Sequence, residues 1–137
     1  MGIEFLILIL MIFFHILDDY GLQATCLCDL KQKSFWEKNA PEKMYEKDYI
    51  WALIMHAFSW TTCISFPIIM AILCSGMVPS SIFYAVFVIN VVVHAYVDDM
   101  KANKFKINLW EDQLAHMYQI GITFIAYVSG VLTTCPV

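Results

Sequence analysis

Four long apolar segments separated by polar connections constrain this chain more than any other feature of its sequence. They cover about residues 2–23, 49–74, 79–100 and 109–133. Each is long enough for a helix to cross the hydrocarbon core of a bilayer. A helix satisfies all its backbone hydrogen bonds within one segment, as a single span in lipid requires. The sequence therefore predicts an all-α polytopic membrane protein, one domain over residues 1–137, in which four transmembrane helices form an up-down bundle.

The charges support this class and predict its topology. The chain is 61% apolar and 15% charged, whereas a soluble domain averages about 45–50% and about 25%. All eight basic residues are lysines, interleaved with acids, so arginine is not present to read bases and no nucleic-acid partner is expected. The lysines lie in the polar connections 25–48 and 101–109. Because short lysine-bearing connections stay in the cytoplasm, both termini are expected to face outward, into the periplasm for a bacterial inner membrane.

Each apolar segment contributes one histidine, and the four are expected at one depth. They lie about six to eight residues from the cytoplasmic ends of their segments, or roughly 9–12 Å at 1.5 Å per residue. Three have an aspartate one helical turn away on the same face: His15 with Asp19, His94 with Asp98, and His116 with Asp112. Ionisable side chains inside a membrane are costly and therefore mark a functional candidate.

Imidazole and carboxylate groups that converge in a bundle core are typical of a metal site. The candidate ligands are His15, Asp19, His56, His94, Asp98, Asp112 and His116. They exceed the needs of one tetrahedral zinc ion and suffice for two ions. Since no thiolate accompanies them, the expected divalent metal is zinc, manganese or iron. Taken alone, His56 is better interpreted as a hydrogen-bonding residue between helices, but the joint set favours metal binding.

Further polar residues flank this set. Asn90, Gln23, Gln113, Asp18 and Asp99 are candidates for outer partners or additional ligands. Asp18, Asp99 and Glu111 are better interpreted as solvated carboxylates at the membrane boundary. In the connection 25–48, Phe35, Trp36 and Tyr45 leave open an interfacial helix or an ordinary solvated loop.

The combined order of these motifs resembles a known family. It reads His15-xxx-Asp19-xxx-Gln23, then His56, then His94-xxx-Asp98-xx-Lys101, then Asp112-Gln113-xx-His116. It resembles a domain-of-unknown-function family of small four-helix membrane proteins from phages and bacteria, over nearly the whole chain. That family is similar in style to inner-membrane proteins described as metal-dependent hydrolases. The resemblance implies a four-helix membrane fold and a metal centre, but no substrate. This chain departs by doubling two aspartates, Asp18-Asp19 and Asp98-Asp99.

Three functions are compared on these residues. The first is a membrane-embedded hydrolase acting on a lipid or lipid-linked phosphoester or ester near the cytoplasmic leaflet, with Asp98 and Asp19 as catalytic carboxylates. Lys101, with Lys104, would hold a phosphate, although a snorkelling boundary lysine is the simpler interpretation of Lys101. The second is a phage or bacterial membrane protein for interaction or structure, whose His/Asp layer fastens helices or binds a static metal. Ion or proton transport has less support because the outer halves of the segments are poor in ionisable residues. The sequence leaves open whether copies of the chain associate.

Overall fold

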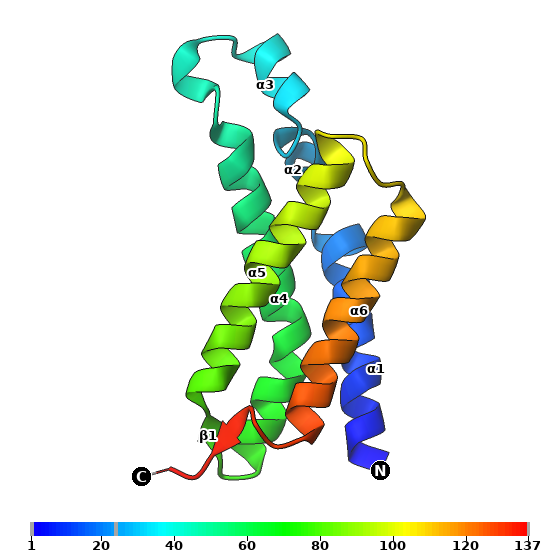
Figure 1. The fold of residues 1–137 in the computed structure, drawn as a ribbon, viewed down its shortest axis with the longest axis vertical. Helices are drawn as coiled ribbons and strands as arrows, with labels where there is room; N and C mark the ends of the chain where they lie inside the picture. Colours follow the sequence, from blue (N-terminus) through cyan, green and yellow to red (C-terminus); the bar gives the residue numbers. More distant parts are fainter. Residues whose placement is uncertain (1, 24, 137) are drawn as a thin grey trace.

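The computed structural model describes residues 2–23 and 25–136 of the chain, and nearly all of its regular structure is helical (Figure 1). The long helices are α1 (Gly2–Ile16) with its π-helical continuation η1 (Leu17–Leu22), α4 (Asp48–Cys74), α5 (Ser81–Ala102) and α6 (Leu109–Val128). The short elements are α2 (Thr25–Leu30), α3 (Lys33–Asn39), the 3-10 turn η2 (Lys43–Tyr45), and the strands β1 (Val78–Pro79) and β2 (Thr133–Thr134). The all-α prediction is confirmed.

The long helices lie side by side and alternate in direction. Helix α4 packs against both α1 and α5, while α6 packs against α5 and α1. Both ends of the chain lie at one end of the bundle, and α2 and α3 lie at the other (Figure 1). The up-down order predicted from the sequence is therefore present.

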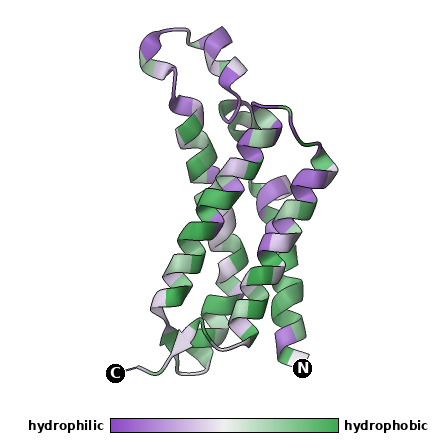
Figure 2. Cartoon of the chain, viewed as in Figure 1, coloured by the Kyte–Doolittle hydropathy of each residue, from purple (hydrophilic) through white to green (hydrophobic). Residues whose placement is uncertain are grey.

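Polar and apolar side chains are distributed unlike those of a water-soluble bundle. The buried side chains are polar about as often as they are apolar, whereas many large apolar side chains, such as Phe13, Met55 and Ile122, are exposed. The apolar core surrounds Trp60, Ile64 and Ile68 of α4. Hydrophobic residues cover most of the length of the bundle, and hydrophilic ones gather toward the α2–α3 end (Figure 2). A large exposed apolar surface marks a contact with lipid or protein.

Among the described residues, three helical segments are long and apolar enough to cross a membrane: Gly2–Leu22, Lys43–Cys74 and Ser81–Ala102. Helix α6 is not among them, because its first three turns carry many polar residues. Of these, Asp112, His116 and Gln119 are buried, whereas Leu114, Tyr118 and Ile122 are exposed on its outer side. The polar residues of α6 thus lower its mean hydropathy while facing the bundle interior, and its role as a fourth span stays a prediction.

The third segment forms a helix of the predicted length that is shifted along the chain, and the fourth forms a shorter helix than predicted. Helix α5 begins at Ser81 because the Ser80 side chain caps it, accepting a hydrogen bond from the Phe83 N–H. Pro79, expected in the first helical turn, instead pairs with Thr133 in a two-stranded ribbon. Helix α6 ends at Val128 rather than near 133, since Gly130, with φ +80°, turns the chain back toward this ribbon.

The first segment changes its hydrogen-bond pattern at its polar end. Residues Leu17–Leu22 form a π-helical turn, and the Gln23 N–H bonds to the Asp18 carbonyl, five residues back. A π turn adds a residue to the helical turn and is frequent at functional sites. Adjacent residues of an α-helix point about 100° apart, yet here both Asp18 and Asp19 have side chains at most 9% exposed. The wider turn is the local feature that accompanies the burial of both aspartates.

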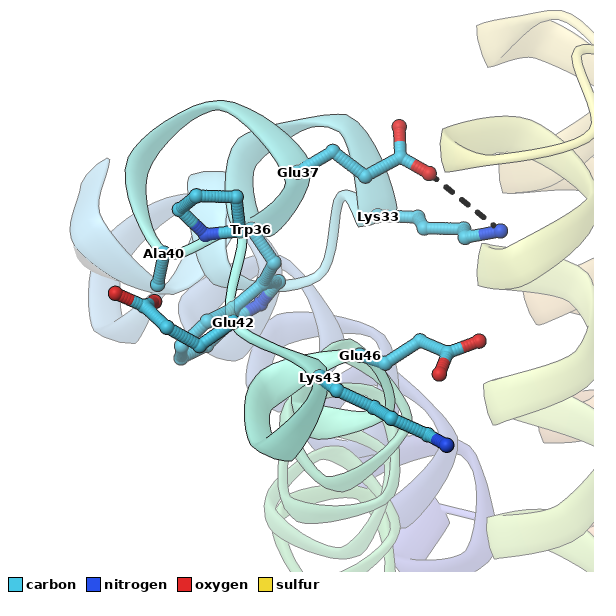
Figure 3. Close-up of a pocket in the computed structure, with 8 residues that line it drawn as sticks. Lys33, Trp36, Glu37, Ala40, Glu42, Lys43 and Glu46 are labelled. Atoms are coloured by element: carbon cyan, nitrogen blue, oxygen red, sulfur yellow. Dashed lines mark ion pairs between the residues drawn. The ribbon is translucent and has the colours of Figure 1, made fainter.

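The connection 25–48 is helical rather than an open loop. The Trp36 ring stacks on Tyr45 with 6.2 Å between centroids, and the Trp36 Nε1–H donates to the Leu30 carbonyl. Figure 3 shows the hollow of about 260 Å³ beside them, where Lys33 pairs with Glu37. This segment therefore has a defined structure, and its proposed contact with headgroups stays a prediction.

Candidate metal centre

The four long helices bring the four histidines into one buried layer. The ring centroids of His94 and His116 lie 4.1 Å apart, those of His56 and His94 5.1 Å, and those of His15 and His116 5.8 Å. All four side chains are at most 2% exposed. The Trp60 ring stacks on His94 at 4.2 Å and fills the apolar side of the layer. The predicted common depth is therefore realised as direct contact.

Asp98 lies at the centre of this layer. Its Oδ1 is 3.5 Å from His116 Nε2 and 3.7 Å from His94 Nε2. Its Oδ2 is 3.5 Å from His56 Nε2 and accepts a hydrogen bond of 2.6 Å from Lys31 Nζ. One carboxylate thus faces three imidazoles and an ammonium group.

Asp19 approaches the same ring nitrogen of His56 as Asp98 does. Its Oδ1 is 3.5 Å from His56 Nε2, and its Oδ2 is 3.4 Å from His15 Nδ1. Gln113 Nε2 donates to the same Oδ2 at 3.3 Å. His15 and Asp19 therefore face each other, as their four-residue spacing predicts, even though a π turn follows His15.

The prediction that Asp18 is a solvated boundary carboxylate is wrong. It is 1% exposed, because the π turn coincides with an inward orientation of its side chain. Its Oδ1 accepts a 2.6 Å hydrogen bond from Ser59, and its Oδ2 lies 3.6 Å from His56 Nδ1. A carboxylate on one ring nitrogen, with the other nitrogen facing a site, is the arrangement that orients metal-binding histidines.

Three lysines lie near the cluster, and two of them, Lys31 and Lys101, pair with its aspartates. Lys101 donates to Asp112 Oδ2 at 2.6 Å. Lys104 instead pairs with Asp99 at 2.7 Å and lies over the Tyr96 ring, on the outside of α5. The hydrogen bond to Asp99 raises the pKa of Lys104 above its ordinary value. Lys104 is therefore directed away from the cluster, contrary to the phosphate-holding role expected for it.

Sequence reasoning missed Lys31. It lies between α2 and α3, and its side chain is only 11% exposed. Asn103, just after α5, anchors the backbone that follows Lys31, accepting from the Lys33 N–H and donating to the Lys31 carbonyl. The path of a polar connection cannot be read from helical periodicity, so nothing in the sequence pairs Lys31 with Asp98.

His94 is the most informative residue of the cluster. It is fully buried, and within the part of the chain that the structure describes neither of its ring nitrogens has a hydrogen-bond partner. Buried polar atoms are normally hydrogen-bonded, so an exception calls for an explanation such as an ion. His94 also belongs to both described groups whose ligand atoms lie within 4.8 Å of one another: Asp19, His56 and His94, and His94, Asp98 and His116.

Two of the seven predicted metal ligands lie outside these groups. His15 Nδ1 accepts a 2.8 Å hydrogen bond from Trp60 Nε1–H, and Asp112 is held by Lys101. Their part in metal binding stays a prediction. Cys63 donates to Asp18 but belongs to neither group, and all five cysteines are free thiols. The ligand atoms are therefore nitrogen and oxygen, which suits zinc, manganese or iron.

A chain of hydrogen bonds fixes how His116 faces the site. Gln119 Nε2 donates to the Asn90 backbone carbonyl, a group that can only accept. The other end of the amide, Oε1, then faces His116 Nδ1 at 3.4 Å, so this nitrogen carries the proton in a neutral ring. The lone pair of His116 Nε2 therefore points at Asp98 and Asp112, each 3.5 Å away. A lone pair facing two carboxylates favours a cation, or a second proton, between them.

The charges of the histidine layer also require an additional positive charge. Four carboxylates reach it (Asp18, Asp19, Asp98 and Asp112), and two of them are paired with a lysine. Two negative charges remain for the histidines or a bound cation to neutralise, since isolated charges are costly to bury. One divalent ion, or two protonated histidines, would balance the site.

The cluster is reachable from the α2 end. A cavity of about 90 Å³ is lined by Asp19, His56, Asp98 and Asp112, together with Lys31 and Lys101. A hollow of about 310 Å³ next to it shares Gln23, Lys31, Asp98 and Lys101 with that cavity. A small molecule or a headgroup therefore has a route to the carboxylates.

The His116 chain gives a first prediction. Gln119→Leu removes the acceptor on Nδ1 and is expected to weaken divalent metal binding about 10–100-fold. Gln119→Glu keeps an acceptor there and should restore most of the affinity, which a purely packing role would not explain. Calorimetric titration with Zn²⁺ measures both variants beside Tyr118→Leu, an exposed control on α6. Equal affinities in all three would contradict this role.

Comparisons with protein-family models, curated proteins and solved structures found no match. The resemblance to a domain-of-unknown-function family stays a prediction. The geometry of the cluster is therefore the basis for assigning a function.

Proposed function

We propose that this protein is a membrane-embedded, metal-dependent hydrolase that cleaves an ester or phosphoester of a lipid or lipid-linked substrate. The observation that carries the proposal is His94: a fully buried imidazole without a hydrogen-bond partner, beside carboxylates that lysines only partly neutralise. A ligand that binds both nitrogen and carboxylate oxygen accounts for both features, and a divalent cation is such a ligand.

His94, Asp98 and His116 are the residues proposed to hold the ion. All three are buried, and their ligand atoms lie within 4.8 Å of one another. Three protein ligands that leave a further position open are typical of catalytic rather than structural zinc sites. A divalent ion supplies Lewis acidity and lowers the pKa of a coordinated water toward neutrality. Asp19, His56 and His94 offer a place for a second ion.

Asp19 is proposed as the carboxylate that accepts a proton during hydrolysis. It lines the 90 Å³ cavity together with Asp98, on the side where a substrate can approach. His15 and Gln113 hold its Oδ2, and its Oδ1 is directed to the His56 side. Asp98 is proposed as a metal ligand, and Lys101, at the rim of the cavity, as a group that faces the anionic part of the substrate.

A membrane location is supported by surface chemistry. Three helices have the length and composition of spans, and α6 shows its apolar side outward. Exposed aromatic residues, of the kind enriched at membrane interfaces, lie at the helix ends near the cluster: Tyr20, Trp51, Phe105 and Trp110. Four spans, with the lysine-bearing connections in the cytoplasm of a bacterial inner membrane and the termini outside, agree with these features. The cluster would then lie just below the cytoplasmic headgroups.

Asp19→Asn tests the catalytic assignment. We expect hydrolysis to fall about 10²–10⁴-fold, the usual contribution of a positioned general base, while His94, Asp98 and His116 still bind metal. The assay presents phospholipids and lipid esters in mixed micelles to the metal-loaded protein and detects products by mass spectrometry. Asp29→Asn, at an exposed position on α2, is the control. Full activity in Asp19→Asn, or no activity of the wild type on the whole panel, would sink the hydrolase assignment.

The ion pairs favour one alternative, an interaction or structural protein in which the polar layer fastens helices. Lys31 and Lys101 already bind Asp98 and Asp112 at 2.6 Å each. In that case the purified protein would hold no metal, and aspartate-to-asparagine substitutions would change stability alone.

A further inference from the structure

We propose that Lys31 and Lys101, with Gln23, form a phosphate-binding site at the mouth of the metal centre, and that metal binding transfers Lys31 from Asp98 to the phosphate. The inference rests on the proposed metal site and deepens it, because it makes the substrate a phosphate ester rather than a carboxylic ester.

The position of the lysines is the first argument. Lys31 and Lys101 line both the inner cavity of about 90 Å³ and the outer hollow of about 310 Å³. Gln23 also lines both, and its amide oxygen, in the orientation that satisfies its neighbours, accepts a hydrogen bond from Lys31. A group that enters the outer hollow therefore meets two ammonium groups beside Asp98, before it reaches Asp19 and Asp112 in the inner cavity.

The present partners of the lysines are the second argument. Lys31 binds Asp98, which is also the carboxylate nearest to three imidazoles. An ion held by His94, Asp98 and His116 would compete with the ammonium group for the same carboxylate. The Lys31 ammonium group therefore neutralises Asp98 when no ion is bound, and a bound ion would take over this role.

A released Lys31 needs another anion. Its side chain is 11% exposed, and a buried charge without a partner is strongly unfavourable. Asn103 holds the backbone directly after Lys31, at the Lys31 carbonyl and the Lys33 N–H, so release from Asp98 would move the Lys31 side chain rather than this backbone. Lysine is a common phosphate ligand that acts as a point charge. A phosphate in the outer hollow would supply that anion for Lys31, beside the ammonium group of Lys101.

Metal and phosphate should therefore bind cooperatively. The metal frees Lys31 for phosphate, and the phosphate holds Lys31 off Asp98, so each ligand raises the affinity for the other by the same factor. Coupling of this kind is typically about 5–150-fold. The phosphate could belong to a lipid headgroup or be free, and the chemistry of recognition is the same.

The test uses the full chain in detergent. Calorimetry measures the affinity for inorganic phosphate with and without saturating Zn²⁺ and, separately, Mn²⁺, and the affinity for each metal alone. We expect metal to raise phosphate affinity at least fivefold in the wild type. Lys31→Met should keep metal affinity equal to or tighter than that of the wild type and lose the enhancement, whereas Lys31→Arg should retain it. Lys33→Met is the control, because Lys33 is exposed and pairs with Glu37.

The outcomes separate the two proposals. Metal binding without any effect on the affinity for either inorganic phosphate or phosphatidic acid micelles, or an unchanged enhancement in Lys31→Met, overturns the phosphate site and leaves the metal centre standing. No binding of either metal overturns both. A parallel titration with short-chain phosphatidic acid micelles identifies the source. Coupling only with the micelles assigns the site to a lipid headgroup, and equal coupling with inorganic phosphate assigns it to phosphate in general.

Discussion

Replacement of His94 by phenylalanine is expected to remove bound metal without weakening the bundle. Phenylalanine keeps a ring to stack on Trp60 and His116 but has no ligand atom. Since His94 donates and accepts no hydrogen bond, its loss leaves no partner unsatisfied within the described chain. The exchange is close to volume-conserving and should change the free energy of unfolding by less than about 1.5 kcal/mol. The metal content of the purified protein, measured by mass spectrometry, should then fall from about one or two equivalents to nearly none.

His15→Phe is the matched control, and it should behave in the opposite way. His15 lies outside both ligand groups, but it accepts the Trp60 Nε1–H. Its loss leaves that buried donor unpaired, at a cost of about 1–3 kcal/mol, while metal remains bound. If the polar layer only fastens helices, neither variant will affect metal content, because the wild type will contain none.

The depth of the histidines could be predicted because helices are rods with a fixed rise. His15, His56, His94 and His116 each sit a similar distance from the polar end of a segment, and an antiparallel bundle aligns those ends. The pairing of His94 with Asp98, and of His116 with Asp112, follows from the same geometry within one helix. These inferences needed only local periodicity and the order of the segments.

Other features depend on contacts between segments that are distant in the sequence. A π turn at Leu17–Leu22 departs from the helical period, so the burial of Asp18 was missed. The ribbon of Pro79 with Thr133 delays the start of the third predicted helix and leaves the fourth shorter. It could not be predicted, because its pairing joins residues far apart in the chain. The position of Lys31 depends on how α2 folds back over the bundle. That one lysine changes the charge balance of the whole site.

This charge balance gives the largest expected effect on stability. Asp98→Asn removes the charge that holds Lys31, and both side chains are buried, at 7% and 11% exposure. Leaving one member of a buried ion pair without its partner typically costs about 3–5 kcal/mol. The free energy of unfolding, measured in metal-free detergent by titration with a denaturing surfactant, should fall by that amount. Adding Lys31→Met to Asp98→Asn should restore most of it, since the stranded charge is then gone.

Asp112→Asn provides the comparison, because the pair that it breaks is open to water. Lys101 is 39% exposed, so its ammonium group can be hydrated once Asp112 is neutral. The loss should therefore be near 1 kcal/mol or less, as for ion pairs with access to solvent. Metal binding should stay absent from the Asp98→Asn/Lys31→Met protein despite its recovered stability, since the carboxylate is still missing. Recovery of metal together with stability would mean that Asp98 only anchors Lys31, and the ion would then have to be held by Asp19, His56 and His94 instead.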